Sequence, residues 1–409
     1  MTRRLLAALA LTLLLAPAAR ASVEEFSTWH VAVIESDDEN FFDHWLVRQP
    51  LRWDDEYRAA PNAFRTSQGC YTAGQWYQAN DFKARAPMGK HAYLDIGMQQ
   101  MFDDLAQYQW VRFEFRFRTS GAGTFGFRFQ PAQDKSKQDF AALWDWGEPG
   151  GPLEIGAAFT VEDAFNSLWE FRQSQVGDHS EPYRAHPVEP ALRIASRGKH
   201  HRVELNGKWL TPLRADLLQP DLVKTGDYAL WGTKGALLAV ATAGPWELEA
   251  RASDQQVLSH ASTVGTPGDG HNFRRLWHAE GAVRRRIGAG WVAEARGAYQ
   301  DRAENWQPPI ANGEFLALDR GLAAELAGEP RKNWHARVGV MHDRIGVEQQ
   351  GQVPVFTWGT RKESRAYLGL EALFGRVRVL GIECIELDSE PYEVTFHHDK
   401  GFLQLQTTF

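Results

Sequence analysis

A strict two-residue alternation of apolar and charged side chains runs through the second half of the chain. In "FRRLWHAEGAVRRRIG", Phe273, Trp277 and Val283 fall on one side, whereas Arg274 and Glu280 fall on the other. The next stretch, "WVAEARGAYQDR", repeats the pattern. Successive side chains of a β-strand point to opposite faces, whereas a helix would need apolar residues three and four apart. The alternation therefore predicts strands with one apolar face and one charged face.

The connections between these stretches alternate in length. Short turns are expected at 242–246, 288–290, 328–331 and around Gly375, with longer polar connections at 253–272, 301–313 and 347–362. Outer-membrane barrels alternate tight periplasmic turns with long external loops, and their strands exceed the usual globular length. We predict an all-β transmembrane antiparallel up-and-down β-barrel of about 16 strands, within a range of about 14–18. A soluble antiparallel sheet, with the aromatic faces packed in a core, is the alternative.

The first half of the chain is less regular. The stretch "QWVRFEFRFRTSGAGTFGFRFQP" predicts a hairpin whose Phe-rich face opposes an Arg-rich face. Residues 91–101, 140–147, 153–161 and 200–210 are predicted to be further strands, and 26–34 and 41–48 are weaker candidates. Residues 49–70 fit a strand poorly. They are expected to form either a periplasmic turn with a short helix or a segment inserted into the lumen.

The first residues have the organisation of a secretory signal. Arg3 and Arg4 precede an apolar run from Leu5 to Leu15, and a small-residue cleavage site follows. This predicts a signal peptide at 1–21, cleaved before Ser22, and a single barrel domain at 22–409. The two cysteines, Cys70 and Cys384, are too few and too far apart in the sequence for a disulfide framework.

The composition agrees with this interpretation. The chain holds 16 Trp, 23 Phe and 10 Tyr, yet its mean hydropathy is −0.44, as expected when only alternate residues meet lipid. The net charge of −7 gives no indication of nucleic-acid binding. Aromatic girdles mark the membrane interfaces of such barrels. The residues expected in them are Trp246, Trp277, Trp291, Trp334 and Tyr367.

The last nine residues, "GFLQLQTTF", alternate and end on an aromatic residue. Leu403, Leu405, Thr407 and Phe409 share one face. This resembles the C-terminal assembly signal of bacterial outer-membrane β-barrel proteins, although no single porin family is matched. The resemblance implies an integral outer-membrane location in a Gram-negative bacterium, recognition by the barrel-assembly machinery, and outer-membrane lipids and lipopolysaccharide as surroundings.

The charged face is predicted to line the lumen. Its arginines either guide an anionic solute or pair with carboxylates on neighbouring strands and brace the wall. The predicted lumen-lining residues are Arg112, Glu114, Arg116, Arg118, Arg128, Arg274, Glu280, Arg284, Arg286, Glu294, Arg296, Arg337, Arg365, Glu371, Arg376 and Arg378. Arg302, Glu325 and Glu383 are expected on the same face.

No sequence motif indicates an enzyme. No G-x-S-x-G or H-E-x-x-H is present, and the adjacent pairs His200-His201 and His397-His398 would point to opposite faces of a strand. We expect no catalytic residue, metal or cofactor. The predicted function is a porin-like channel with an Arg-rich lumen favouring anionic solutes. The alternatives are a barrel for polysaccharide export or secretion, with periplasmic partners, and a barrel hydrolase or acyltransferase.

Overall fold

The computed structural model describes residues 60–409, apart from 71–75, 104–106, 120, 132–137, 148–150, 167–181, 220, 265–268, 289, 308–311, 353–360 and 388–397. The predicted signal peptide, residues 26–34 and 41–48, and the first part of the 49–70 segment lie outside the described residues. No helix in the described part is long and apolar enough to cross a membrane.

The described residues form nineteen strands, and these account for nearly all of the regular structure. In chain order they are β1 (Ala63–Cys70), β2 (Trp76–Pro87), β3 (Ala92–Asp103), β4 (Gln107–Thr119), β5 (Gly123–Gln130), β6 (Asp139–Trp146), β7 (Leu153–Val161), β8 (Tyr183–Ala185), β9 (Val188–Arg197), β10 (His201–Leu218), β11 (Lys224–Ala243), β12 (Trp246–Thr263), β13 (Asp269–Ile287), β14 (Trp291–Trp306), β15 (Asn312–Arg331), β16 (Trp334–Gln352), β17 (Arg361–Phe374), β18 (Val377–Glu386) and β19 (His398–Thr408).

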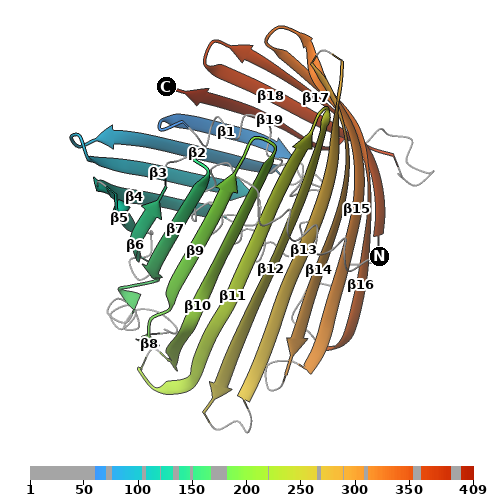
Figure 1. The fold of residues 1–409 in the computed structure, drawn as a ribbon. Helices are drawn as coiled ribbons and strands as arrows, with labels where there is room; N and C mark the ends of the chain where they lie inside the picture. Colours follow the sequence, from blue (N-terminus) through green and yellow to red (C-terminus); the bar gives the residue numbers. More distant parts are fainter. Residues whose placement is uncertain are drawn as a thin grey trace, which may run out of the picture.

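The strands pair in sequence order around a closed ring (Figure 1). Every pairing is antiparallel, running from β1 to β7, from β7 to β9, and on to β19. The short β8 pairs with β10 beyond the end of β9, so it continues the line of β9 and adds no place to the ring. Eighteen strands therefore close the barrel. The predicted fold class is confirmed, at the upper end of the expected strand range.

The C-terminal strand closes the barrel. On one side β19 pairs with β18, and on the other it pairs with β1 from Thr408↔Ala63 to Gly401↔Cys70. The N–H of Phe409 donates to the carbonyl of Asn62 at 3.2 Å, so pairing extends to the last residue. In lipid an unpaired strand edge would leave backbone groups without hydrogen bonds, which explains why the chain stays regular to its end.

The expectation for residues 49–70 is wrong over 63–70, which form β1. This strand carries polar residues on both faces, with Arg65 inward and Thr66 outward, so its alternation is weak. Backbone pairing with β2 and β19 on its two sides defines its place instead.

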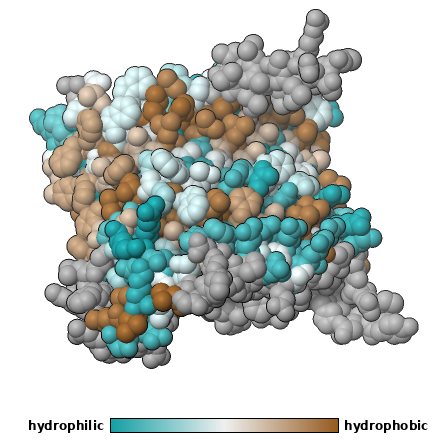
Figure 2. Space-filling view, turned by 90° about the horizontal axis from the view of Figure 1, so that it is seen from below, coloured by the Kyte–Doolittle hydropathy of each residue, from teal (hydrophilic) through white to brown (hydrophobic). Residues whose placement is uncertain are grey.

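The outward face carries an apolar belt. Leu248, Leu322 and Leu368 are each more than half exposed on this face. The belt runs from Trp291 to Tyr299 on β14, about the nine to eleven residues that a tilted membrane strand requires. In the view of Figure 2, apolar (brown) residues gather over one part of the surface and a band of hydrophilic (teal) residues runs beside them.

Aromatic residues mark both edges of this belt. Trp246, Trp291 and Trp334 begin their strands at the short-turn end. At the opposite edge the rings of Trp277 and Tyr299 meet, with centroids 5.4 Å apart. Beyond them the outward face becomes polar, as in the 2.7 Å ion pair between Arg275 and Asp254.

Strands β10 to β16 continue well past the belt. They are 16–20 residues long and form the tall side of the wall in Figure 1. The predicted long loops at 253–272, 301–313 and 347–362 are correspondingly shorter, because pairing continues through their polar sequences. The turn expected at 328–331 lies instead at 332–333, where Asn333 has a φ of 67°. Asparagine tolerates this left-handed conformation.

The belt predicts a depth-dependent cost for outward substitutions. Leu368→Arg places a charge within the belt and should lower the free energy of unfolding by about 2–4 kcal/mol. Leu316→Arg, on the outward face of β15 beyond the belt, should cost about 0–1 kcal/mol. Urea unfolding after insertion into phospholipid vesicles measures both, and equal costs would contradict the belt.

Candidate functional site

The inward face carries most of the predicted lumen residues. Cross-strand register places one parity of each strand inward, and buried charged residues identify that parity. The residues on the inward face are Arg112, Glu114, Arg116 and Arg118 on β4, Arg128 on β5, Arg274, Glu280, Arg284 and Arg286 on β13, Glu294 and Arg296 on β14, Arg302 on β14, Glu325 on β15, Arg337 on β16, Arg365 and Glu371 on β17, and Arg378 on β18.

Two of the predicted positions are wrong. Arg376 lies in the β17–β18 turn and is exposed, because the strand ends at Phe374. Glu383 falls on the outward side of β18, whose inward residues include the buried Leu380 and Ile382. Both errors come from continuing a period of two without knowing where the strand ends or which parity faces inward.

Glu114 is the centre of an arginine cluster on β4 and β5. Its side chain is buried, and its carboxylate lies 3.3 Å from Nε of Arg112, 2.8 Å from Nη2 of Arg116 and 3.3 Å from Nε of Arg128. Arg116 also pairs with Asp145 on β6. Three guanidinium groups surround one carboxylate, so this part of the wall carries more positive than negative charge.

A second cluster lies across β12, β13 and β14, and it is rich in carboxylates. Arg284 Nη1 lies 2.7 Å from Glu247 and 2.6 Å from Glu249, and its Nε pairs with Glu294. Arg296 Nε lies 2.7 Å from Glu294. Glu280 and Arg251 complete this cluster through Arg296 and Glu249 respectively.

Sequence reasoning missed several charged residues of the inward face. Arg193 on β9 bridges Glu154 on β7, at 3.1 Å, and Glu204 on β10, at 3.0 Å. Glu247 and Glu249 on β12 were also missed. Glu154 and Arg193 are lone charged residues at inward positions among small or apolar ones, as in "LEIGAAFTV", whereas Glu247 and Glu249 alternate with apolar residues in "WELEAR". Both patterns are visible in the sequence, but a search restricted to arginine-rich stretches does not detect them.

Tyr367 faces inward, so its predicted place in an aromatic girdle is wrong. Its side chain is buried, and its hydroxyl donates to Glu325 at 2.7 Å, beside Arg337, whose Nε donates to the same oxygen at 2.8 Å. A tyrosine among alternating apolar residues has the sequence appearance of a girdle residue. Only the register between β16 and β17 shows that this tyrosine faces inward, among the charged residues.

Glycines opposite these side chains let them lie along the wall. A Cβ built on Gly126 would lie 2.7 Å from Cδ of Arg116, and one on Gly369 would lie 2.5 Å from Cγ of Arg337. Gly339 likewise accommodates the ring of Tyr367. The two arginines and the tyrosine therefore lie over glycine and do not project towards the barrel axis.

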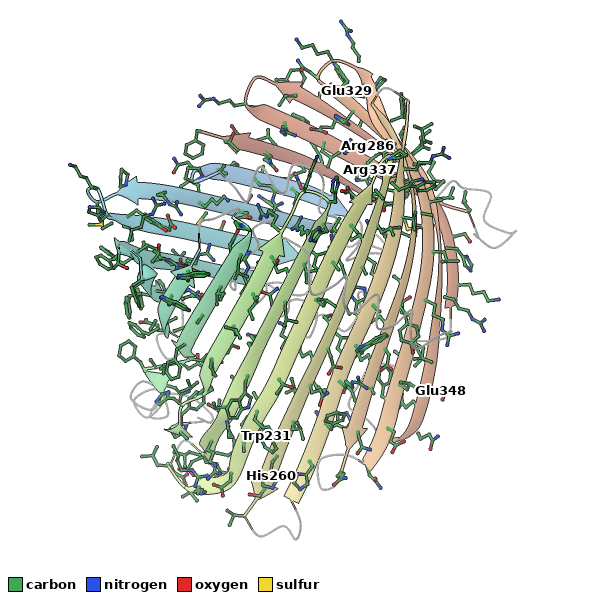
Figure 3. All side chains as sticks on the ribbon, viewed as in Figure 1. Trp231, His260, Arg286, Glu329, Arg337 and Glu348 are labelled. Atoms are coloured by element: carbon green, nitrogen blue, oxygen red, sulfur yellow. The ribbon has the colours of Figure 1, made fainter. Side chains whose placement is uncertain are left out.

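The clusters around Glu114 and Arg284 lie in the short-turn half of the barrel. In Figure 3, Arg286 and Arg337 lie near that end, whereas Trp231, His260 and Glu348 lie near the other. Among the described residues, no group of three or more His, Cys, Asp or Glu side chains is placed to hold a metal ion.

One polar pair on the outward face has the composition of a nucleophile and base. Nδ1 of His342 lies 2.8 Å from Oγ of Ser364, directly across from it on β17. In the described neighbourhood, the outward residues next to His342 are Leu322, Val340 and Arg344, so no carboxylate or amide orients the imidazole. The pair also fits an ordinary cross-strand hydrogen bond.

Comparison with known proteins gives no family. No family model matches the chain, and no curated protein matches it. Solved structures that resemble it include CdiB from Acinetobacter baumannii (TM-score 0.43, 10% identity, 85% of this chain and 60% of that chain), OccK5 from Pseudomonas aeruginosa (0.39, 10%, 85% and 96%) and OmpT, an outer membrane protein of Vibrio cholerae (0.37, 11%, 84% and 94%). Because these TM-scores are below 0.5, the barrel assignment rests on this chain's own strand pairings.

The glycine recesses predict a position-specific cost. Gly369→Ala should lower the free energy of unfolding by about 1–3 kcal/mol through overpacking against Arg337. Gly381→Ala is the matched control, since its Cβ would meet only Cδ1 of Leu403, at 4.0 Å. Urea unfolding in lipid vesicles compares the two. A Gly369 variant as stable as the Gly381 variant would show that the arginine is not held over the glycine.

Proposed function

We propose that the protein is an outer-membrane channel whose Arg-rich inward sector favours anionic solutes. The observation that carries this proposal is a local surplus of positive charge on β2–β6. There, six cations share the short-turn half of the inward face with four carboxylates. They are Lys83, Arg85, Arg112, Arg116, Arg118 and Arg128, against Asp95, Glu114, Asp139 and Asp145.

The charges on the opposite side of the barrel indicate that the preference for anions over cations is moderate. Across β12–β16, Glu247, Glu249, Glu280, Glu294 and Glu325 balance Arg251, Arg284, Arg286, Arg296 and Arg337. Paired charges cancel beyond a few ångströms, and salt screens the remainder over about 8–10 Å. These pairs brace adjacent strands, and the β2–β6 sector supplies the surplus field that concentrates anions.

Export of an acidic polysaccharide is a variant of the same proposal. A row of arginines would suit repeated carboxylates as well as small anions, because the guanidinium fork matches carboxylate geometry. The two versions differ in the required bore. Passage of a polymer through the purified barrel in vesicles, against passage of small anions only, distinguishes them.

The His342–Ser364 pair favours a second candidate function, an outer-membrane hydrolase or acyltransferase. A serine within hydrogen-bond reach of a histidine is the minimum for an activated hydroxyl nucleophile. Against it, Ser364 contacts Nδ1 and the described surroundings supply no orienting group for the other nitrogen. The channel proposal is therefore preferred.

The channel proposal predicts opposite effects from two substitutions. Arg118→Ser removes an exposed positive charge and should lower the Cl⁻/K⁺ permeability ratio roughly 1.5- to 3-fold. Glu114→Gln leaves its three arginines less neutralised and should raise the ratio. Reversal potentials in planar bilayers under a KCl gradient measure both. Lys332→Ser, in a short turn, is the control; unchanged potentials in both test variants would defeat the proposal.

The hydrolase candidate makes a separate prediction. A fluorophosphonate probe should label the purified wild-type barrel, and Ser364→Ala should abolish the labelling. Ser67→Ala, on the inward face of β1, serves as the matched control and should label like wild type. Absence of labelling in the wild type would remove this candidate without affecting the channel.

A further inference from the structure

Three basic side chains form one cross-strand row on the outward face. Arg320 on β15 pairs in register with Arg344 on β16, and Arg344 pairs with Lys362 on β17. All three side chains are exposed. They lie on the same face as Leu322 and Val340, opposite to the buried Asp319 and Met341, so they point away from the lumen.

Among the described residues, no carboxylate lies directly opposite a member of this row on a neighbouring strand. In the part of the chain that the structure describes, none of the three forms an ion pair. Within the described strands, the outward acids nearest in register are Asp301, diagonal to Arg320, and Glu348, four residues farther along β16 (Figure 3). Like charges directly opposite each other on adjacent strands destabilise the pairing. An anion from outside the chain would remove this repulsion.

The level of the row identifies its surroundings. The next outward level towards the short turns holds Leu322 on β15 and the His342–Ser364 pair on β16 and β17. The exposed belt residues Val340 and Leu368 follow two and three outward positions from the row on their strands. Tyr299, at the upper edge of the belt, pairs in register with Arg320, whose guanidinium lies 5.9 Å from the ring centroid. The row therefore lies where the apolar belt ends, on the side of the long connections. In such barrels the long connections are extracellular.

We propose that Arg320, Arg344 and Lys362 form a binding site for the phosphates of a lipid in the external leaflet. The acyl chains of that lipid would lie against the apolar belt. A free phosphate ion has no apolar part and could not make this contact. The row covers two interstrand spacings, roughly 10 Å, wider than one phosphate, so it fits a glycolipid headgroup with two phosphates. Arg and Lys donate charge-assisted hydrogen bonds to phosphate oxygens. This site does not depend on what passes through the lumen.

The test is lipid binding to the intact, detergent-solubilised barrel, followed by native mass spectrometry. The probes are bis-phosphorylated lipid A, the same lipid without phosphates, and inorganic phosphate. Wild type should bind bis-phosphorylated lipid A at least about tenfold more tightly than the triple variant Arg320→Gln/Arg344→Gln/Lys362→Gln. The dephosphorylated lipid should bind both proteins equally, and inorganic phosphate should not displace lipid A.

A control with the same charge change separates a site from general attraction. Arg285→Gln/Arg331→Gln/Lys332→Gln removes three exposed cations from the short-turn side of the barrel. It should keep wild-type affinity, and both variants should retain the heat-modifiable mobility of a folded barrel. Equal loss in the two triple variants, affinity within twofold of wild type in the first, or displacement by millimolar inorganic phosphate would each overturn the proposal.

Discussion

Closure of the backbone hydrogen-bond ladder is the constraint on which the rest of the structure depends. Lipid offers no partner for an unpaired N–H or C=O group, so the edges of the first and last strands of the sheet must hydrogen-bond to each other. Here β19 pairs with the whole of β1, from Gly401 to Thr408, although β1 contains little of the alternation that marks the other strands. With the ring closed, each residue is assigned to lipid or to the interior by parity alone.

Parity explains how much could be read from the sequence. The alternation in 273–302 and in "RFEFRFR" contains both faces of the wall, so the apolar belt and the inward placement of Arg284 or Glu114 followed from it. The barrel class followed from this alternation together with the alternating short and long connections. The lengths of the strands did not follow from the alternation. The belt requires about nine to eleven residues, and nothing in the local pattern shows that β11 or β15 continues to 20 residues by polar pairing.

The pairing of arginines with carboxylates on the inward face could not be predicted from the sequence. Arg193 has carboxylate neighbours 39 and 11 residues away, and Arg284 has partners 37 and 10 residues away. These pairs exist only through register, which is a property of the closed ring. Counting arginines along single strands therefore overstated the surplus, and the same lack of register placed Tyr367 on the lipid side.

The glycines beneath Arg116, Arg337 and Tyr367 have a consequence for calibre. A side chain that lies across a glycine of the neighbouring strand occupies wall area and does not extend towards the barrel axis. In the channel proposed above, the width at that height would therefore be set by the backbone and not by the length of arginine. A methyl group added at the glycine would push the long side chain inwards and narrow the passage, with every charge retained.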